Sequence, residues 1–247
     1  MSRTMAAAAM GFRDQARRPL LLILLVIVPA YTITRSIAIT LPTPRQIGLP
    51  GGIEIDTTMR AIHGAEMAGS TIAFVTALCG VFVMGSALAG DRRLVIAGYR
   101  PGQVVCARLV VLGAATALVV AVSMLITAAN FTPAAWLPFV TGATLIGLLY
   151  AGIGALAGAV LDKLAATYLI LFLALTDLGI VQNPMFGDGT PDDWAAVLPG
   201  YGPSRVMTDG GFSPTFHAGE DLWLSLAWVV AIGAGVAVVL SREVRPR

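Results

Sequence analysis

Long apolar stretches separated by short polar breaks run through the whole chain. A helix that crosses the hydrocarbon core of a membrane, roughly 30 Å thick, needs about 20 mainly apolar residues. The apolar stretches reach this length, and no polar stretch is long enough to form a second, soluble domain. The pattern therefore predicts one all-α membrane domain over residues 1–247. Its six expected spans cover about 20–39, 67–89, 104–128, 137–161, 164–181 and 222–240.

An amphipathic segment precedes the first expected span. Over residues 1–19, Met5, Ala9 and Phe12 share one helical face and arginines occupy the other, before Pro19 ends the pattern. Such a helix is typical of segments that lie in the membrane interface; a solvated helix end is the alternative. The apolar stretch that follows is too long for a signal-peptide core and lacks a small-residue cleavage site, which favours an uncleaved first span.

Polar segments connect the spans. Residues 41–66 are rich in Pro and Gly, which predicts a loop. Residues 91–103 form a basic break between the second and third spans. The longest polar segment, residues 182–219, contains Thr190-Pro191-Asp192-Asp193, a pattern typical of a helix start.

Composition agrees with a membrane protein and excludes other classes. Apolar residues make up 57% of the chain and charged residues 12%, with a mean hydropathy of +0.81. Soluble domains average about 45–50% apolar and about 25% charged. An ordinary soluble enzyme, a disordered chain and a nucleic-acid binder are therefore excluded.

The net charge of +2 conceals an uneven distribution of the basic residues along the chain. Four basic residues precede Pro19, four lie within residues 91–108, Lys163 is one more, and three follow Ser241. With six spans, all of these fall on one side. Short loops rich in Arg or Lys remain cytoplasmic, so both termini are predicted to be cytoplasmic. The other side holds only Arg35, Arg45, Arg60 and Arg205.

Known catalytic and nucleotide-binding patterns are missing from the chain. It has no G-x-x-x-x-G-K-[ST], H-E-x-x-H or G-x-S-x-G sequence, so it cannot bind ATP through a P-loop of its own. Cys79 and Cys106 lack metal or redox spacing, and His63 and His217 stand alone. We expect no catalytic residue, no metal and no directly bound cofactor.

Asp177 is the one clear charge predicted inside a span, in the outer half of the fifth. A charge in hydrocarbon is costly and calls for a partner, water or the protein interior. Arg35 and Arg60 are the candidate partners. A structural pair, and a role in substrate binding or gating, both remain open.

Glycines recur in the fourth span, and Gly154 and Gly158 form a G-x-x-x-G pattern. Small residues at this spacing permit close helix contact. We expect this contact within the subunit rather than at a dimer face.

Two local patterns resemble those of a transporter family. One is Asp91-Arg92-Arg93-Leu94 through Gly98-Tyr99-Arg100-Pro101, and the other is Leu198-Pro199-Gly200-Tyr201-Gly202-Pro203-Ser204-Arg205. With the interfacial helix, the six spans and the outer segment, the chain resembles over its whole length the membrane subunit of ABC transporters of the ABC-2 type, an exporter class.

The resemblance implies a mechanism and a set of partners. Two such permease subunits, identical or homologous, would pair among membrane lipids in the bacterial cytoplasmic membrane. Each would dock on a separate P-loop ATPase subunit, which alone brings ATP and Mg. The residues implied in ATPase coupling are Asp91, Arg92, Arg93, Leu94, Tyr99 and Arg100. Those implied in the substrate path or gate are Asp177, Trp194, Leu198 and Tyr201.

The expected substrate is hydrophobic or amphipathic, such as a drug, an antibiotic or a lipid-like molecule, because the spans contain little charge. Two other functions compete with export. An ion-gradient-driven secondary carrier would make Asp177 essential and need no ATPase. A non-transporting membrane anchor would bind a protein complex through residues 91–100 without any transport activity.

Overall fold

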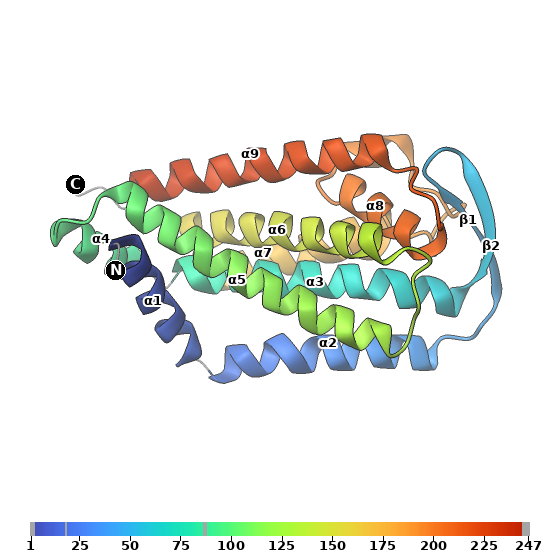
Figure 1. The fold of residues 1–247 in the computed structure, drawn as a ribbon, viewed down its shortest axis with the longest axis horizontal. Coiled ribbons are helices and arrows are strands. Elements are labelled where there is room, and N and C mark those ends of the chain that lie inside the picture. The colour runs from blue at the N-terminus through green and yellow to red at the C-terminus, as the bar shows by residue number, and fades with distance from the viewer. Residues whose placement is uncertain (1–2, 18, 86–87, 244–247) are drawn as a thin grey trace.

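The computed structural model describes residues 3–17, 19–85 and 88–243, and shows long helices lying side by side along one axis (Figure 1). The long helices are α2 (Pro19–Ile39), α3 (Met59–Gly85), α5 (Pro101–Ala128), α6 (Trp136–Val160), α7 (Lys163–Thr176) and α9 (Gly219–Glu243). Shorter elements are α1 (Arg3–Ala16), α4 (Leu88–Ile96), a π-helical turn η1 (Asp177–Val181), a 3-10 turn η2 (Asp193–Val197) and α8 (Tyr201–Phe212).

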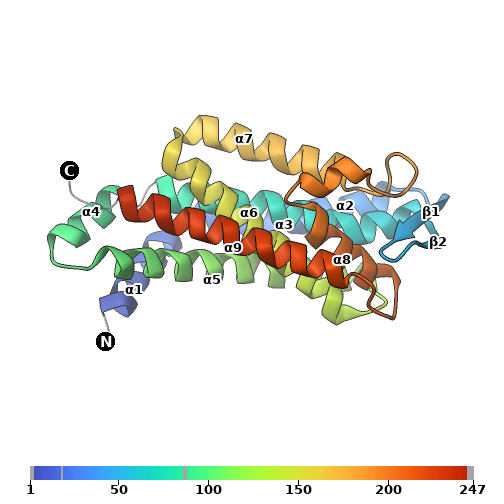
Figure 2. The same cartoon turned by 90° about the horizontal axis from the view of Figure 1, so that it is seen from above.

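The short elements gather at the two ends of the bundle. Helices α1 and α4 lie at one end, where α9 also finishes, and we call this the α4 end (Figure 1). Helix α8 and strands β1 (Pro44–Leu49) and β2 (Ile53–Thr58) lie at the opposite end, called the hairpin end. Successive long helices alternate in direction between these ends, so α1 and the last residues of α9 both lie at the α4 end (Figure 2).

Five helices in the described part of the chain are long and apolar enough to cross a membrane: α3, α5, α6, α7 continued by η1, and α9. The chain is therefore a multi-pass membrane protein by the length and composition of its helices. Helix α2 has 21 residues, of which Leu25–Ile39 forms the described apolar stretch. The first expected span, over residues 20–39, stays a prediction, as does the cytoplasmic side of the termini.

Close contact between α3 and α6 forms the centre of the bundle. A Cβ atom at Gly154 would overlap the carbonyl oxygen of Ala77, and one at Gly158 would overlap that of Val81. From the other side, a Cβ at Gly80 would overlap the carbonyl oxygen of Ala151. The backbones touch because these positions have no side chain, which confirms the expectation that the G-x-x-x-G pattern packs within the subunit.

The all-α prediction is wrong at residues 41–66, where the expected loop contains a β-hairpin. Strands β1 and β2 pair antiparallel, from Leu49 with Ile53 to Pro44 with Thr58, around a turn at Pro50–Gly52. Gly51 and Gly52 have φ angles of 82° and 74°, which favour glycine. The Pro and Gly residues that predicted a loop instead make a tight turn. Alternate residues of the strands pack against the start of α3 in one apolar cluster of Ile47, Leu49, Ile53, Ile55, Met59 and Ile62.

The second span also starts earlier than predicted. Helix α3 begins at Met59 rather than at residue 67, and its described part ends at Gly85 rather than 89. The polar residues His63 and Glu66 mark a loop by composition, yet both lie within the helix. Glu66 is buried there because its carboxylate has a partner on α8, described below.

The segment predicted to lie in the membrane interface forms α1, which packs on α5 through small residues. Ala7, Ala8 and Gly11 are buried, and Ala7 and Ala8 cluster with Ala107 of α5. Met5 and Phe12, from the predicted apolar face, are exposed. Helix α1 thus packs on α5 through small residues, and larger apolar side chains lie on its exposed face.

We predict that Gly154→Ala destabilises the protein by about 1–3 kcal/mol, since the added methyl group must push α6 away from the α3 backbone. Gly233→Ala on α9 is the matched control, because a Cβ there has no neighbour within 4 Å. Thermal unfolding in detergent measures both. Equal unfolding midpoints for the two variants would contradict the close α3–α6 contact.

Candidate functional site

The α4 end is held together by a buried ion pair. Asp91 on α4 is 1% exposed, and Arg108 on α5 donates to both of its carboxylate oxygens. The Nη2–Oδ1 distance is 2.6 Å and the Nε–Oδ2 distance is 2.9 Å. Two-pronged Arg–carboxylate contacts fix orientation as well as distance. The pair therefore sets the angle between α4 and α5.

Two further contacts brace α4. Arg92 donates from Nη2 to the Glu243 carboxylate at 2.9 Å and from Nε to the Glu243 carbonyl oxygen at 2.8 Å, which joins α4 to the end of α9. Leu94 and Tyr99 pack against the small-residue cluster between α1 and α5. Helix α4 is thus tied to three other helices.

Only some of the residues expected to couple to an ATPase face outward. Arg93 and Arg100 are exposed, and so is Ile96. Asp91 is turned inward, and Leu94 and Tyr99 are half-buried. Arg92 is exposed but engaged with α9. The structure thus divides the predicted set into outward-facing arginines and a bracing group beneath them.

At the hairpin end, Asp177 is 1% exposed and accepts hydrogen bonds from three donors. The Tyr150 hydroxyl on α6 donates to Oδ2 at 2.6 Å, and the Gly200 amide donates to the same oxygen at 2.9 Å. Gln182 Nε2 donates to Oδ1 at 3.1 Å. The carboxylate joins α6, η1 and the segment that leads into α8.

The expected pairing of Asp177 with Arg35 or Arg60 is wrong. Arg60 Nε donates to the Thr40 carbonyl oxygen at 2.9 Å, and Arg35 is exposed on α2. In the described part of the chain no cation contacts Asp177. Neutral donors replace the cation because the π-helical turn at Asp177–Val181 brings the carboxylate against the Gly200 amide.

The Leu198–Arg205 pattern has a physical basis in close packing. A Cβ at Gly200 would meet both carboxylate oxygens of Asp177, and a Cβ at Gly202 would overlap the Asp221 carbonyl oxygen on α9. Both positions require glycine because α8 begins in contact with two neighbours. The pattern places α8 between α6 and α9.

Glu66 is a buried carboxylate that sequence reasoning assigned to a loop. It is buried on α3 and accepts a hydrogen bond from Thr208 Oγ1 of α8 at 2.7 Å. A helical reading of the residues before 67 would have placed Glu66 inside the second span. Nothing in the sequence points to Thr208, which lies 142 residues away.

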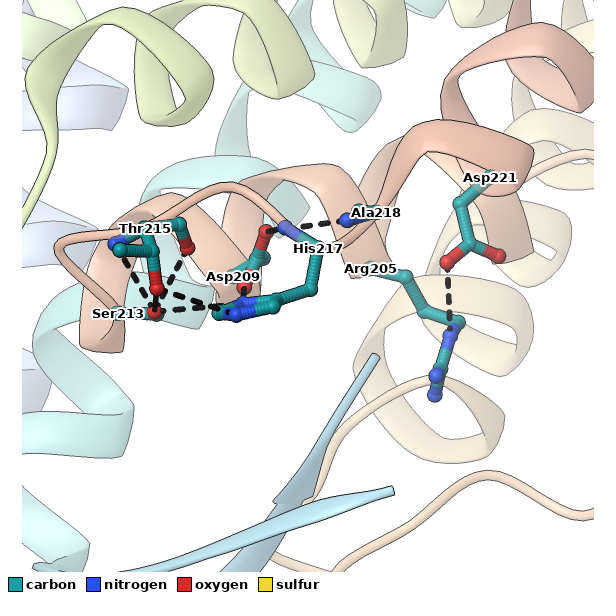
Figure 3. Close-up of polar contacts among 7 residues, drawn as sticks. All are labelled: Arg205, Asp209, Ser213, Thr215, His217, Ala218 and Asp221. Atoms are coloured by element: carbon teal, nitrogen blue, oxygen red, sulfur yellow. Dashed lines mark hydrogen bonds and ion pairs between the residues drawn. The ribbon is translucent and has the colours of Figure 1, made fainter. Parts of the chain in front are cut away.

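Side-chain contacts fasten α8 to the start of α9 (Figure 3). The buried Asp209 carboxylate accepts from the backbone amides of His217 at 2.7 Å and Ala218 at 3.2 Å, just before α9 begins. Arg205 Nε donates to Asp221 Oδ2 at 3.2 Å. Asp209 thus caps the start of α9, and the polar residues of this corner hold α8 against α9.

The other residues expected in the substrate path do not form one site. Trp194 is 56% exposed, and its Nε1 donates to Asp192 Oδ2 at 3.1 Å. The Tyr201 ring lies 5.4 Å from Arg205 Cζ, on the side of α8 that faces α9. Leu198, which lies between Trp194 and Tyr201 in the sequence, is half-buried. Trp194, but neither Leu198 nor Tyr201, lines an open cavity at this end.

Comparison with known proteins does not assign the chain to a family. No family model and no curated protein matches the chain. Within residues 3–17, 19–85 and 88–243, no three His, Cys, Asp or Glu side chains are grouped to hold a metal ion. The braced α4 end and the polar hairpin end are therefore the two candidate sites.

We predict that Arg108→Ala destabilises the protein by about 3–5 kcal/mol, because it leaves the buried Asp91 carboxylate without its counter-charge. Arg92→Ala removes an exposed pair and costs about 0–1 kcal/mol. Chemical unfolding in detergent gives both values, and trypsin cleavage after Arg93 reports release of α4. If Arg108→Ala cost no more than Arg92→Ala, the bracing role of the pair would be refuted.

Proposed function

We propose that the chain is the permease subunit of an ATP-driven exporter of the ABC-2 type in the bacterial cytoplasmic membrane. Two permease subunits, identical or homologous, pair in the lipid, and each carries a separate P-loop ATPase subunit. The substrate is hydrophobic or amphipathic. ATP and Mg bind only to the partner, since this chain has no P-loop.

The observation that carries this proposal is the construction of the α4 end. Helix α4 is held by Arg108 to α5, by Glu243 to α9, and by an apolar cluster to α1. A movement of α4 would therefore be transmitted to α1, α5 and α9 together. An anchor that only holds a partner does not need such rigid connections, whereas a subunit driven by an ATPase does.

The distribution of charge supports a cytoplasmic α4 end, which is the side where ATP is available. Arg93 and Arg100 face outward, and most of the basic residues of the chain lie in the segments at this end. Cytoplasmic loops retain Arg and Lys. Exposed arginines beside the exposed Ile96 offer a partner both charge and apolar surface.

The contacts of Asp177 give less support to an ion-gradient-driven carrier. A group that binds and releases an ion or proton must change its partners during the cycle. Asp177 accepts from three donors on different segments, so its carboxylate serves as a structural junction. We assign it to closing the hairpin end rather than to energy coupling.

We predict that Arg93→Glu combined with Arg100→Glu reduces ATP-dependent transport at least tenfold while the permease still folds. The reversed charges repel an ATPase surface that has formed around arginines. Transport in vesicles containing the permease and a P-loop ATPase encoded beside it measures the effect. Arg60→Glu, a single charge reversal at the hairpin end, is the control and leaves transport within twofold, whereas Arg93→Glu and Arg100→Glu tested singly each reduce it.

A second pair of variants separates the exporter from the carrier. Asp177→Asn and Glu66→Gln keep the shape of each side chain and remove its charge. ATP-driven export survives both within a few-fold. Two results together would overturn the exporter proposal in favour of the carrier. Transport would continue without ATP, and Asp177→Asn would abolish it although the variant still folds.

A further inference from the structure

A cavity of about 280 Å³ opens at the hairpin end, between η1 and the segment that leads into η2. Small-molecule sites begin at about this size, roughly 300 Å³. Its walls include Ile180, Phe186, Asp188, Asp192 and Trp194. It lies apart from the Asp177 junction and from the Asp209 corner, neither of which contributes a lining residue.

The wall of the cavity is pinned to the hairpin and is therefore preformed. The Gly189 carbonyl oxygen accepts a hydrogen bond from the Gly48 amide of β1 at 3.1 Å. Arg45, also on β1, donates from Nη2 to the Gly187 carbonyl oxygen. Gly189 has a φ angle of 85° and passes so close to the backbone at Gln46 that no side chain fits. The segment from 187 to 190 thus has a fixed course beside β1.

Two aromatic rings are left uncovered at the cavity. Phe186 is 52% exposed and Trp194 is 56% exposed, on a segment in which Gly189 is buried but most other residues are exposed. The hydrogen bond from Trp194 Nε1 to Asp192 holds the indole in one orientation. Large apolar side chains beside a polar rim mark a binding surface.

The charge of the cavity is negative. Asp188 and Asp192 are the charged lining residues, and no Lys or Arg lies on the wall. Asp188 makes no hydrogen bond or ion pair with any residue that the structure describes. The guanidinium of Arg45 is directed to a backbone carbonyl oxygen instead.

Carboxylates beside aromatic faces select organic cations. A cation is attracted to the face of an aromatic ring, with Trp the best ring, and a carboxylate adds direct electrostatic attraction. A metal ion would need several convergent ligands, and the described residues provide no such group. An anion or a neutral lipid tail would leave the carboxylates unpaired.

We propose that this cavity binds amphipathic organic cations, with the cationic group at Asp188 and Asp192 and the apolar part on Phe186 and Trp194. As the substrate class of the exporter this rests on the proposed function. Binding itself requires neither ATP nor a partner. The cavity is then a site on the outer face that a cation occupies as it leaves the protein.

The test measures binding of benzyltrimethylammonium to the full chain in lipid nanodiscs, without nucleotide or ATPase, by isothermal titration calorimetry. Benzylsulfonate has the same aromatic ring with an anionic group and serves as the matched ligand. Empty nanodiscs give the lipid background. We expect saturable binding of the cation and none of the anion.

The combined variant Asp188→Asn with Asp192→Asn is expected to weaken cation binding at least tenfold, and Trp194→Ala at least threefold. Asp56→Asn on β2 is the matched control: it removes an exposed negative charge at the same end but outside the cavity, and binding stays within twofold. Equal binding of cation and anion, or unchanged binding by the double variant, would overturn the proposal. A protein that binds the cation but needs no ATPase for transport would instead refute the exporter alone.

Discussion

The direct contact between the backbones of α3 and α6 determines where every other element can lie. Gly80, Gly154 and Gly158 remove the side chains that would separate the two helices. Lipid offers little hydrophobic drive for helices to associate, so close packing must supply the attraction. With α3 and α6 in contact, α5, α7 and α9 surround a single central pair, and α8 fills the remaining space at the hairpin end (Figure 2).

The two ends of this rigid core are built differently, and the difference carries the functional argument. At the α4 end, an ion pair and an apolar cluster tie a protruding helix to α1, α5 and α9. At the hairpin end, neutral donors contact Asp177, and the backbone amides of His217 and Ala218 donate to Asp209. In the exporter that we propose, the α4 end would receive force from the ATPase, and the hairpin end would stay closed until then. The cavity proposed to bind cations lies at the hairpin end.

Hydropathy alone predicted the long helices well, because a span must be apolar along most of its length. The boundaries at Trp136 and Gly219 fall within a few residues of expectation. The hairpin was missed because Gly51 and Gly52 signal a turn without showing what it connects, although Ile47, Leu49, Ile53 and Ile55 alternate as strands do. The G-x-x-x-G pattern was interpreted correctly, since glycines at this spacing permit the backbone contact with α3 that the structure shows.

The candidate sites were less predictable, because their chemistry depends on partners far apart in the sequence. Asp177 was recognised as a buried charge, but its partners Tyr150 and Gly200 become neighbours only in the folded bundle. The sequence placed Asp91, Arg93 and Arg100 in one group of coupling residues. In the structure Asp91 is buried in an ion pair with Arg108, whereas Arg93 and Arg100 are exposed. Local sequence patterns indicated where Asp177 and the residues around Asp91 would lie. Their hydrogen-bond and ion-pair partners became evident only from the folded structure.

Both the proposed ATPase surface and the proposed cation site require that the α4 end faces the cytoplasm and the hairpin end faces outward. Single cysteines at Ala97, just after α4, and at Glu54 on β2, both exposed, mark the two ends in a background where Cys106 is replaced by Ala. A membrane-impermeant maleimide is added to intact cells and, separately, to opened membranes. The account predicts that the Glu54→Cys variant reacts in intact cells and that the Ala97→Cys variant reacts only in opened membranes. Reaction of both from outside, or the reverse order, would contradict it.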